Sequence, residues 1–143
     1  MSSLLQNSAQ DRSQIVAAVA LITSCGDLQS AQQTLDQAAS SRQSLLSELD
    51  QLQVGSTPNG GQLVQELRSA WQASLDSDNS YAAYARDESS QFNGCVPNDS
   101  SDRNAQAASN SDAQATAAKE QFVNLWNPIA ATYGLPQWQA SGL

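Results

Sequence analysis

The sequence predicts an all-α protein, an up-down-up-down four-helix bundle with one disulfide at one pole. Apolar side chains recur every three or four residues along four long stretches, which is the spacing of helices that bury one face. Clusters of glycine, proline and asparagine separate these stretches. Cys25 and Cys95 lie at the first and third breaks, which share one pole in a bundle of this topology.

The first helix is expected over residues 3–24 and the second over residues 27–53. Gly26 can adopt the left-handed conformation that ends a helix, and Asp27 can cap the next helix by accepting a backbone N–H. The second helix has the clearest heptad pattern in the chain. Its two core positions hold Leu28, Leu35, Arg42 and Leu49, and Ala31, Ala38, Leu45 and Leu52.

The third helix is expected over residues 62–92, after a turn rich in glycine, proline and asparagine. Its side chains spaced for burial are Val64, Leu67, Trp71, Ser74, Asp78, Tyr81, Ala85 and Phe92.

The fourth helix is expected over residues 99–133, with a kink near 127–128 followed by a short helical segment, because Pro128 interrupts the hydrogen-bond ladder. Gly134, followed by Pro136, predicts its end. The tail to Leu143 either folds back over the core or stays loose.

Length and charge limit the possible functions. The 143 residues suit one domain, 1–143, and a net charge of −8 argues against a nucleic-acid partner or an anionic membrane surface. The longest apolar run is about eight residues, too short for membrane insertion by this segment. The chain has no histidine, which excludes Ser-His-Asp and Cys-His catalysis. No cofactor or metal is expected; the first candidates for an all-oxygen metal site would be Asp76, Asp78, Asp87 and Glu88.

The two cysteines are expected to form a disulfide, because both lie at corners of the same pole. Such a bond favours an oxidising compartment. The alternative is that Cys25 ends a lipoprotein signal peptide, since small residues precede it after a short apolar run. A cationic region, which such a peptide needs, is missing because Asp11 cancels Arg12.

The aromatic residues of the last two helices are expected in the core. At helical spacing they favour burial over a ligand cage that recognises a cation. Tyr133 is expected there too. Lys119, the one lysine, is expected to be solvated or paired with a carboxylate, because a catalytic amine would have to be desolvated. The predicted aromatic core consists of Trp71, Tyr81, Phe122 and Trp126.

Four charges interrupt the apolar stripes, one in each expected helix. Counted from the nearer cysteine along its own helix, Arg42, Asp78 and Asp112 each lie 17 residues away. Arg12 lies 13 residues away, so all four fall within roughly one helical turn of a common level. The sequence therefore predicts a neutral polar core layer of two arginines and two aspartates.

Three interpretations of this layer remain open. It can be a partly buried network that fixes helix register, a role that polar core groups serve in coiled coils. It can be four solvated charges at the edges of the stripes. It can also be a functional polar pocket made by the same residues.

The chain resembles secreted or membrane-anchored helical-bundle proteins of actinobacteria. The resemblance is carried by the run from Phe122 to Ala130, by the Tyr-Gly-Leu-Pro sequence that begins at Tyr133, and by the two corner cysteines. A third element is the helical pattern Ala70-Trp71, Ser74, Asp78, Tyr81 and Ala85-Arg86-Asp87. The resemblance implies an extracellular bundle of uncharacterised function, with no catalytic or ligand residues to transfer.

The expected function is that of a noncatalytic extracytoplasmic binding or sensing domain with an unknown protein or small-molecule partner. Its expected location is extracellular or at the cell surface, with a signal or anchor upstream of Met1. The alternative is a structural spacer or a protein-protein assembly module. An enzyme is not expected, because only carboxylate chemistry remains and no Asp/Glu pair stands out.

Overall fold

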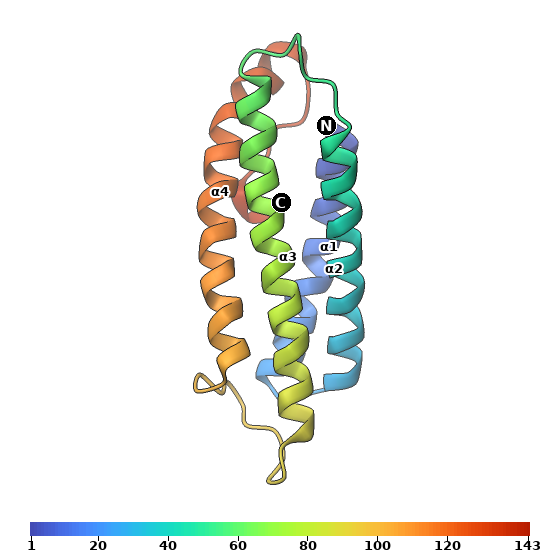
Figure 1. The fold of residues 1–143 in the computed structure, drawn as a ribbon, viewed down its shortest axis with the longest axis vertical. Helices are drawn as coiled ribbons and strands as arrows, with labels where there is room; N and C mark the ends of the chain where they lie inside the picture. Colours follow the sequence, from blue (N-terminus) through green and yellow to red (C-terminus); the bar gives the residue numbers. More distant parts are fainter.

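A computed structural model describes residues 1–143 and consists of four long helices and one short 3₁₀ helix. Neighbouring helices run antiparallel, with the α1–α2 and α3–α4 connections at one pole and the α2–α3 connection at the other (Figure 1). The predicted four-helix bundle is confirmed, and so is the disulfide between Cys25 and Cys95. The elements are α1 Ser2–Thr23, α2 Leu28–Asp50, α3 Gly60–Ser90, α4 Arg103–Tyr133 and η1 Ala140–Gly142.

The end of α1 differs from the expected glycine cap. Cys25, and not Gly26, takes the left-handed conformation, with φ of 53°. Its N–H donates to Ile22 O at 3.0 Å, and the Gly26 N–H donates to Leu21 O at 2.7 Å. These two bonds satisfy the last carbonyls of the helix in a Schellman arrangement that uses a cysteine where glycine is usual. Asp27 caps α2 as predicted, since its side chain accepts from the Ser30 N–H at 2.9 Å.

The connection between α3 and α4 is longer than expected. Asp102 caps α4 by accepting from the N–H groups of Asn104 and Ala105, so the helix begins four residues after the expected start. Because α3 ends at Ser90, Phe92 lies in the connection and is fully exposed. The expectation that Phe92 lies on the inward face of the third helix is therefore wrong.

The C-terminal part of α4 is continuous through Pro128, and no separate helical segment follows the proline. Gly134, with φ of 64°, ends the helix as predicted. Beside the proline, the Trp126 indole N–H donates to Pro136 O at 2.9 Å. The Asn127 amide donates to Trp138 O at 2.9 Å and accepts from the Trp138 N–H at 3.0 Å. These bonds hold the following tail against the helix.

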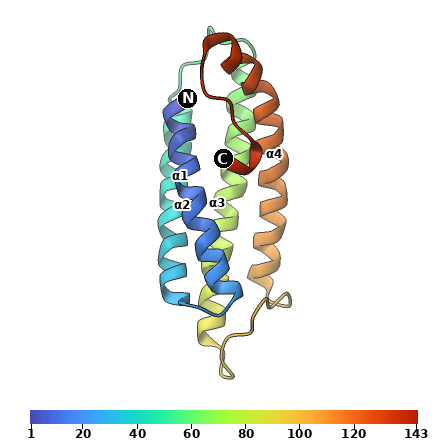
Figure 2. The ribbon, with the colours of Figure 1, turned by 180° about the vertical axis from the view of Figure 1, so that it is seen from behind.

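The tail folds back along the bundle. It descends between α1 and α4, as the view from behind shows (Figure 2). The Leu143 side chain is completely buried in the core. Of the two alternatives for the tail, the structure shows the folded one. The tail thereby occupies the side of the bundle between the first and last helices.

The apolar core is divided into two clusters. The first lies toward the α2–α3 pole and contains Trp71, Phe122 and Trp126, the last two with stacked rings whose centroids are 6.1 Å apart. The second lies toward the cysteine pole and is rich in alanine. Tyr81 is only half-buried and packs against the second cluster. Tyr133 is 64% exposed, so its expected place in the core is wrong.

Candidate functional site

A layer of polar side chains lies between the two apolar clusters, and every long helix contributes to it. The four charges predicted from the sequence all belong to this layer. Arg42 and Asp78 are buried, whereas Arg12 and Asp112 are half-buried. The layer, called the polar layer below, comprises Ser8 and Arg12 of α1, Arg42 of α2, Ser74, Ser77, Asp78 and Tyr81 of α3, and Asp112 and Lys119 of α4.

The centre of the polar layer is an ion pair between α2 and α3. Arg42 Nε lies 4.0 Å from Asp78 Oδ2, and the two side chains are 1% and 4% exposed. Arg42 Nη1 donates a hydrogen bond of 2.6 Å to Ser8 Oγ, which also accepts from the Trp71 indole N–H at 3.1 Å. The guanidinium of α2 is therefore held by contacts to two other helices, α1 and α3.

The other two predicted charges do not pair with each other. Asp112 accepts hydrogen bonds from two α3 hydroxyls, from Ser77 at 2.8 Å and from Tyr81 at 3.0 Å. Burial and the Asp112 carboxylate raise the pKa of Tyr81 to about 12, so its hydroxyl stays a donor. Arg12 has no carboxylate within 4.0 Å. Of the two arginines and two aspartates of the predicted layer, only Arg42 and Asp78 form an ion pair.

Lys119 is the charged member of the polar layer that the sequence reasoning missed. Its side chain is buried, with 6% exposure, and it makes no hydrogen bond and no ion pair with the protein. No carboxylate pairs with Lys119, and its side chain is more buried than the expectation of a solvated lysine implied. Its position was detectable, because Lys119 lies four residues after Ala115 and three before Phe122, both of which are buried.

Burial disfavours the charged forms of Asp78 and Lys119. It raises the pKa of Asp78 to about 7, against the attraction of Arg42 and Lys119. Burial, together with the neighbouring Arg42 and Arg12, lowers the pKa of Lys119 to about 8, while Asp112 and Asp78 oppose the shift. Three enclosed atoms of the layer have no hydrogen-bond partner: Arg42 Nε, Ser74 Oγ and Asp78 Oδ2. Such unsatisfied groups make the layer costly to stability.

A cavity of about 460 Å³ adjoins the polar layer where α1, α4 and the tail meet. Charged side chains of both signs line it, together with two hydroxyl residues and two alanines. The Lys119 nitrogen is not among the enclosed unpaired atoms, so it retains contact with solvent. Lys119 lines the cavity. The lining residues are Arg12, Asp112, Ala115, Thr116, Lys119, Glu120, Ala140 and Ser141.

The raised pKa of Asp78 predicts a loss of stability with rising pH. The fold favours the neutral carboxyl, so its contribution is complete below pH 4 and is lost as pH approaches about 7. We expect the unfolding free energy of the wild type, relative to that of Asp78→Asn, to fall between pH 4 and 7. Urea titrations of both proteins at several pH values measure this difference. A difference that stays constant over this range would show that Asp78 keeps an ordinary pKa.

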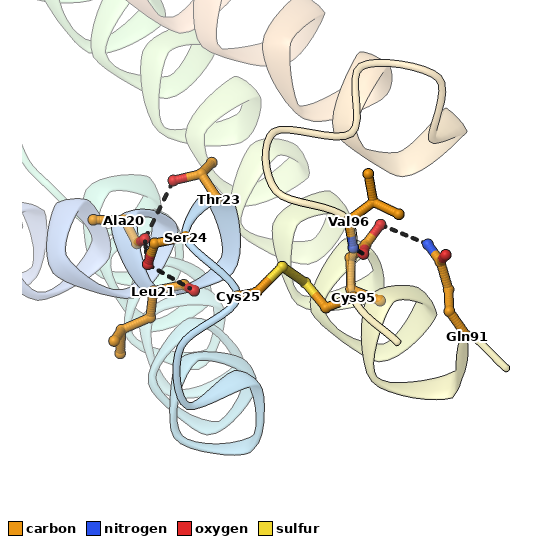
Figure 3. The surroundings of a disulfide bond; sticks show 9 residues. Ala20, Leu21, Thr23, Ser24, Cys25, Gln91, Cys95 and Val96 are labelled. Carbon is orange, nitrogen blue, oxygen red and sulfur yellow. Dashed lines mark hydrogen bonds between the residues drawn. A yellow bond between two sulfur atoms is a disulfide. The ribbon is translucent and has the colours of Figure 1, made fainter. Parts of the chain in front are cut away.

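The cysteine pole contains a second group of chemically notable residues, the half-buried disulfide and the buried Glu88. The disulfide joins Cys25 and Cys95 with their Cα atoms 5.7 Å apart, and Figure 3 shows it between the ends of the two corners. The Asn98 N–H donates to Thr23 O at 3.0 Å, which adds a second link. Glu88 is buried beside the disulfide and accepts from the Val96 N–H at 2.7 Å.

The residue types at this pole could form a metal site, but their ligand atoms are already engaged in a disulfide and in hydrogen bonds. Ligand atoms of Cys25, Cys95 and Glu88 lie within 4.8 Å of one another. Both sulfurs, however, are joined in the disulfide, and the Glu88 carboxylate accepts two hydrogen bonds. The acidic residues named as candidates for an all-oxygen site are separated: Asp76 accepts from Gln72, Asp87 from Asn104, and Asp78 lies in the polar layer.

Known proteins offer no guide to this site. Comparisons of the chain with protein-family models, with curated proteins and with solved structures find no match. None of the helices combines the length and apolar character needed to span a bilayer. The function proposed below therefore depends on the polar layer and its cavity.

Proposed function

We propose that the chain is a noncatalytic extracytoplasmic binding or sensing domain, displayed outside an actinobacterial cell, whose ligand occupies the cavity beside the polar layer. The observation that supports this most directly is Lys119, a buried cation that lines the cavity and has no partner within the protein. Buried charges are normally paired, because desolvation of an isolated charge is costly. A ligand in the cavity would supply the missing partner.

The dimensions of the cavity suit a small molecule. Its volume of about 460 Å³ lies within the range of roughly 300 to 1,000 Å³ that is usual for ligand pockets. Residues of α1, α4 and the tail surround it, so a bound molecule would contact three segments of the chain. Such a molecule would link the tail to the bundle, which is the kind of coupling that a sensing domain needs.

The disulfide supports an extracytoplasmic location. Disulfides persist in oxidising compartments and are rare in the reducing cytosol. Cys25 and Cys95 connect two corners that are 70 residues apart in the sequence, so the bond belongs to the architecture of the bundle.

The surroundings of the candidate reactive groups support a noncatalytic role. Asp78 has the raised pKa that acid-base catalysts often have, but it is enclosed in the core and does not line the cavity. The Asp112 carboxylate, which does line it, is held by two hydroxyls of α3. Lys119 is desolvated, as a lysine nucleophile is, but no carboxylate lies within 4.0 Å of its amine to exchange protons with a substrate.

A second candidate function is a protein-protein assembly module. Phe92 is fully exposed at the cysteine pole, and Tyr133 is exposed at the opposite end. One exposed aromatic at each pole suits end-to-end contacts between proteins. If this function holds, light scattering should show association that increases with concentration and is lost in Phe92→Ser.

The binding function is tested by a thermal-shift screen against a library of small anions, cations, sugars and neutral polar metabolites. At least one compound is expected to raise the melting temperature of the wild type, because binding to the folded state stabilises it.

The matched variant is Lys119→Met, which fills similar volume without charge. Without ligand, this variant should be more stable than the wild type by about 1 to 2 kcal/mol, since a buried charge is removed. It should not respond to the same compound. A library in which no compound shifts the wild type would contradict the proposal.

A further inference from the structure

We propose that the cavity binds a small organic carboxylate, with Lys119 and Arg12 as its two cationic contacts. This inference rests on the proposed binding function and adds the chemical class of the ligand. It follows from the charges that line the cavity, from the partners that those charges already have, and from the partners that they lack.

Lys119 supplies the first argument for an anion. The chain has a net charge of −8 and a single lysine, and this lysine is buried with no carboxylate within 4.0 Å of its amine. The polar layer holds Arg42 and Arg12 close enough to disfavour the ammonium further. An anionic ligand would offset this repulsion, and an ammonium in a low-dielectric site attracts such a group strongly.

Arg12 supplies the second argument. Arg12 is half-buried and lines the cavity from α1, whereas Lys119 lines it from α4. Like Lys119, Arg12 has no carboxylate within 4.0 Å. A guanidinium presents a planar set of N–H donors that matches the two oxygens of a carboxylate. Two helices therefore each contribute one unpaired cation to the same space.

The negative residues of the cavity favour a carboxylate, whose charge is spread over an organic skeleton, over a compact anion. The Asp112 carboxylate has no cation within 4.0 Å and is oriented by the Ser77 and Tyr81 hydroxyls, while Glu120 is exposed. These two groups repel a ligand with concentrated charge, such as phosphate, more than a carboxylate, and repulsion of this kind is a common source of specificity.

The remaining lining suits the body of an organic molecule. Thr116 and Ser141 provide hydroxyls, and Ala115 and Ala140 provide small apolar surfaces. The volume of about 460 Å³ exceeds what a single inorganic ion occupies. The expected ligand thus has a short carbon skeleton with one or two carboxylates.

Isothermal titration calorimetry with succinate at pH 7 tests this inference. Succinate is the probe because it offers two carboxylates on a short chain, and succinamide is its uncharged counterpart of nearly the same shape. Succinate is expected to bind, and succinamide is expected to bind at least tenfold more weakly. Phosphate is the third titrant and should also bind at least tenfold more weakly than succinate.

Three variants locate the binding. Lys119→Met and Arg12→Gln should each weaken succinate binding at least tenfold, because each removes one cation from the cavity. Arg86→Gln is the matched control, since Arg86 is exposed on α3, forms no ion pair and does not line the cavity. The control should bind as the wild type does.

The single lysine permits a direct spectroscopic test. Protein labelled with ¹³C at the lysine Cε gives one side-chain resonance, and its titration reports the protonation of Lys119 alone. Saturating succinate should move the midpoint of this titration to higher pH, because a nearby carboxylate favours the charged ammonium. A carboxylate bound elsewhere on the surface would leave the midpoint unchanged.

The outcomes separate the inference from the function on which it rests. If succinate has no effect but another library compound raises the melting temperature in a Lys119-dependent manner, the carboxylate class is wrong and the binding function holds. If phosphate binds as tightly as succinate, the cavity is a general anion site and the class is again wrong. Equal binding to wild type and to Lys119→Met would place the ligand elsewhere and overturn the inference. If no compound binds at all, both proposals fail.

Discussion

Replacing both Cys25 and Cys95 with serine is expected to lower the free energy of unfolding by about 4 kcal/mol. The bond joins residues that are 70 apart in the sequence, and it limits the conformations of the unfolded chain. In the chain-entropy model, removing the bond stabilises the unfolded state by about 4 kcal/mol for a loop of that length. The bond also joins the two corners at that pole, so without it only noncovalent contacts hold α1 and α2 against α3 and α4 there.

Urea denaturation of the oxidised wild type, the reduced wild type and the double serine variant measures this loss. The last two should agree within experimental error, because neither has the bond. The Asn98–Thr23 and Glu88–Val96 hydrogen bonds remain in both, and the folded baseline should therefore keep its helical circular dichroism. A loss below about 1 kcal/mol would show that the unfolded chain is already compact around this loop, against the entropic account.

The helices and the disulfide could be predicted from the sequence because both depend on local patterns. The three- to four-residue spacing of apolar side chains reflects the geometry of one helix, and Asp27 and Gly134 act at helix ends through their own backbone conformation or side chain. The disulfide followed from topology, since the first and third corners of an up-down-up-down bundle share a pole.

Errors arose at the ends of two helices and at one charged side chain. Phe92 and Tyr133 were expected to face inward from their helical spacing, but α3 ends at Ser90 and Tyr133 is the last residue of α4, so neither side chain reaches the core. Lys119 was expected to be solvated or paired with a carboxylate, although its spacing from buried residues of α4 placed most of its side chain inward. Spacing predicts burial only where the helix continues beside a neighbour, and there it applies to a charged residue as well.

The cavity could not be predicted, because no local pattern encodes it. It exists where Ala140 and Ser141 of the returning tail meet α1 and α4, and the path of the tail was left open by the sequence. Counting residues along each helix predicts that Arg12 and Asp112 lie at a common level along the bundle axis. It does not predict the direction in which each side chain points around its helix. A level fixes the layer, whereas pairing depends on the direction in which each side chain points, and only the Arg42–Asp78 contact formed.

The second large effect is expected from Arg42→Ala, which should lower the free energy of unfolding on the order of 3 to 4 kcal/mol. Arg42 is one of the largest fully buried side chains, and truncation leaves a void between the two apolar clusters. It also removes the 2.6 Å hydrogen bond to Ser8 and the neighbouring cation of Asp78. The void is expected to dominate, because Asp78 can discharge by binding a proton once its partner is gone.

Arg42→Met separates packing from charge, since it refills most of the volume and carries no charge. Burial lowers the pKa of Arg42, and the fold therefore already opposes its charge, so this variant should cost about 1 kcal/mol or less. Urea denaturation at pH 6, where Asp78 is mostly neutral, measures the stability of both variants. Arg86→Ala is the control, because Arg86 is exposed, and its free energy of unfolding should stay within about 0.5 kcal/mol of the wild-type value. If Met costs as much as Ala, the charge of Arg42 and not its volume maintains the polar layer. If Arg42→Ala costs no more than the control, Arg42 is a solvated charge at the edge of its stripe and the polar layer is not part of the core.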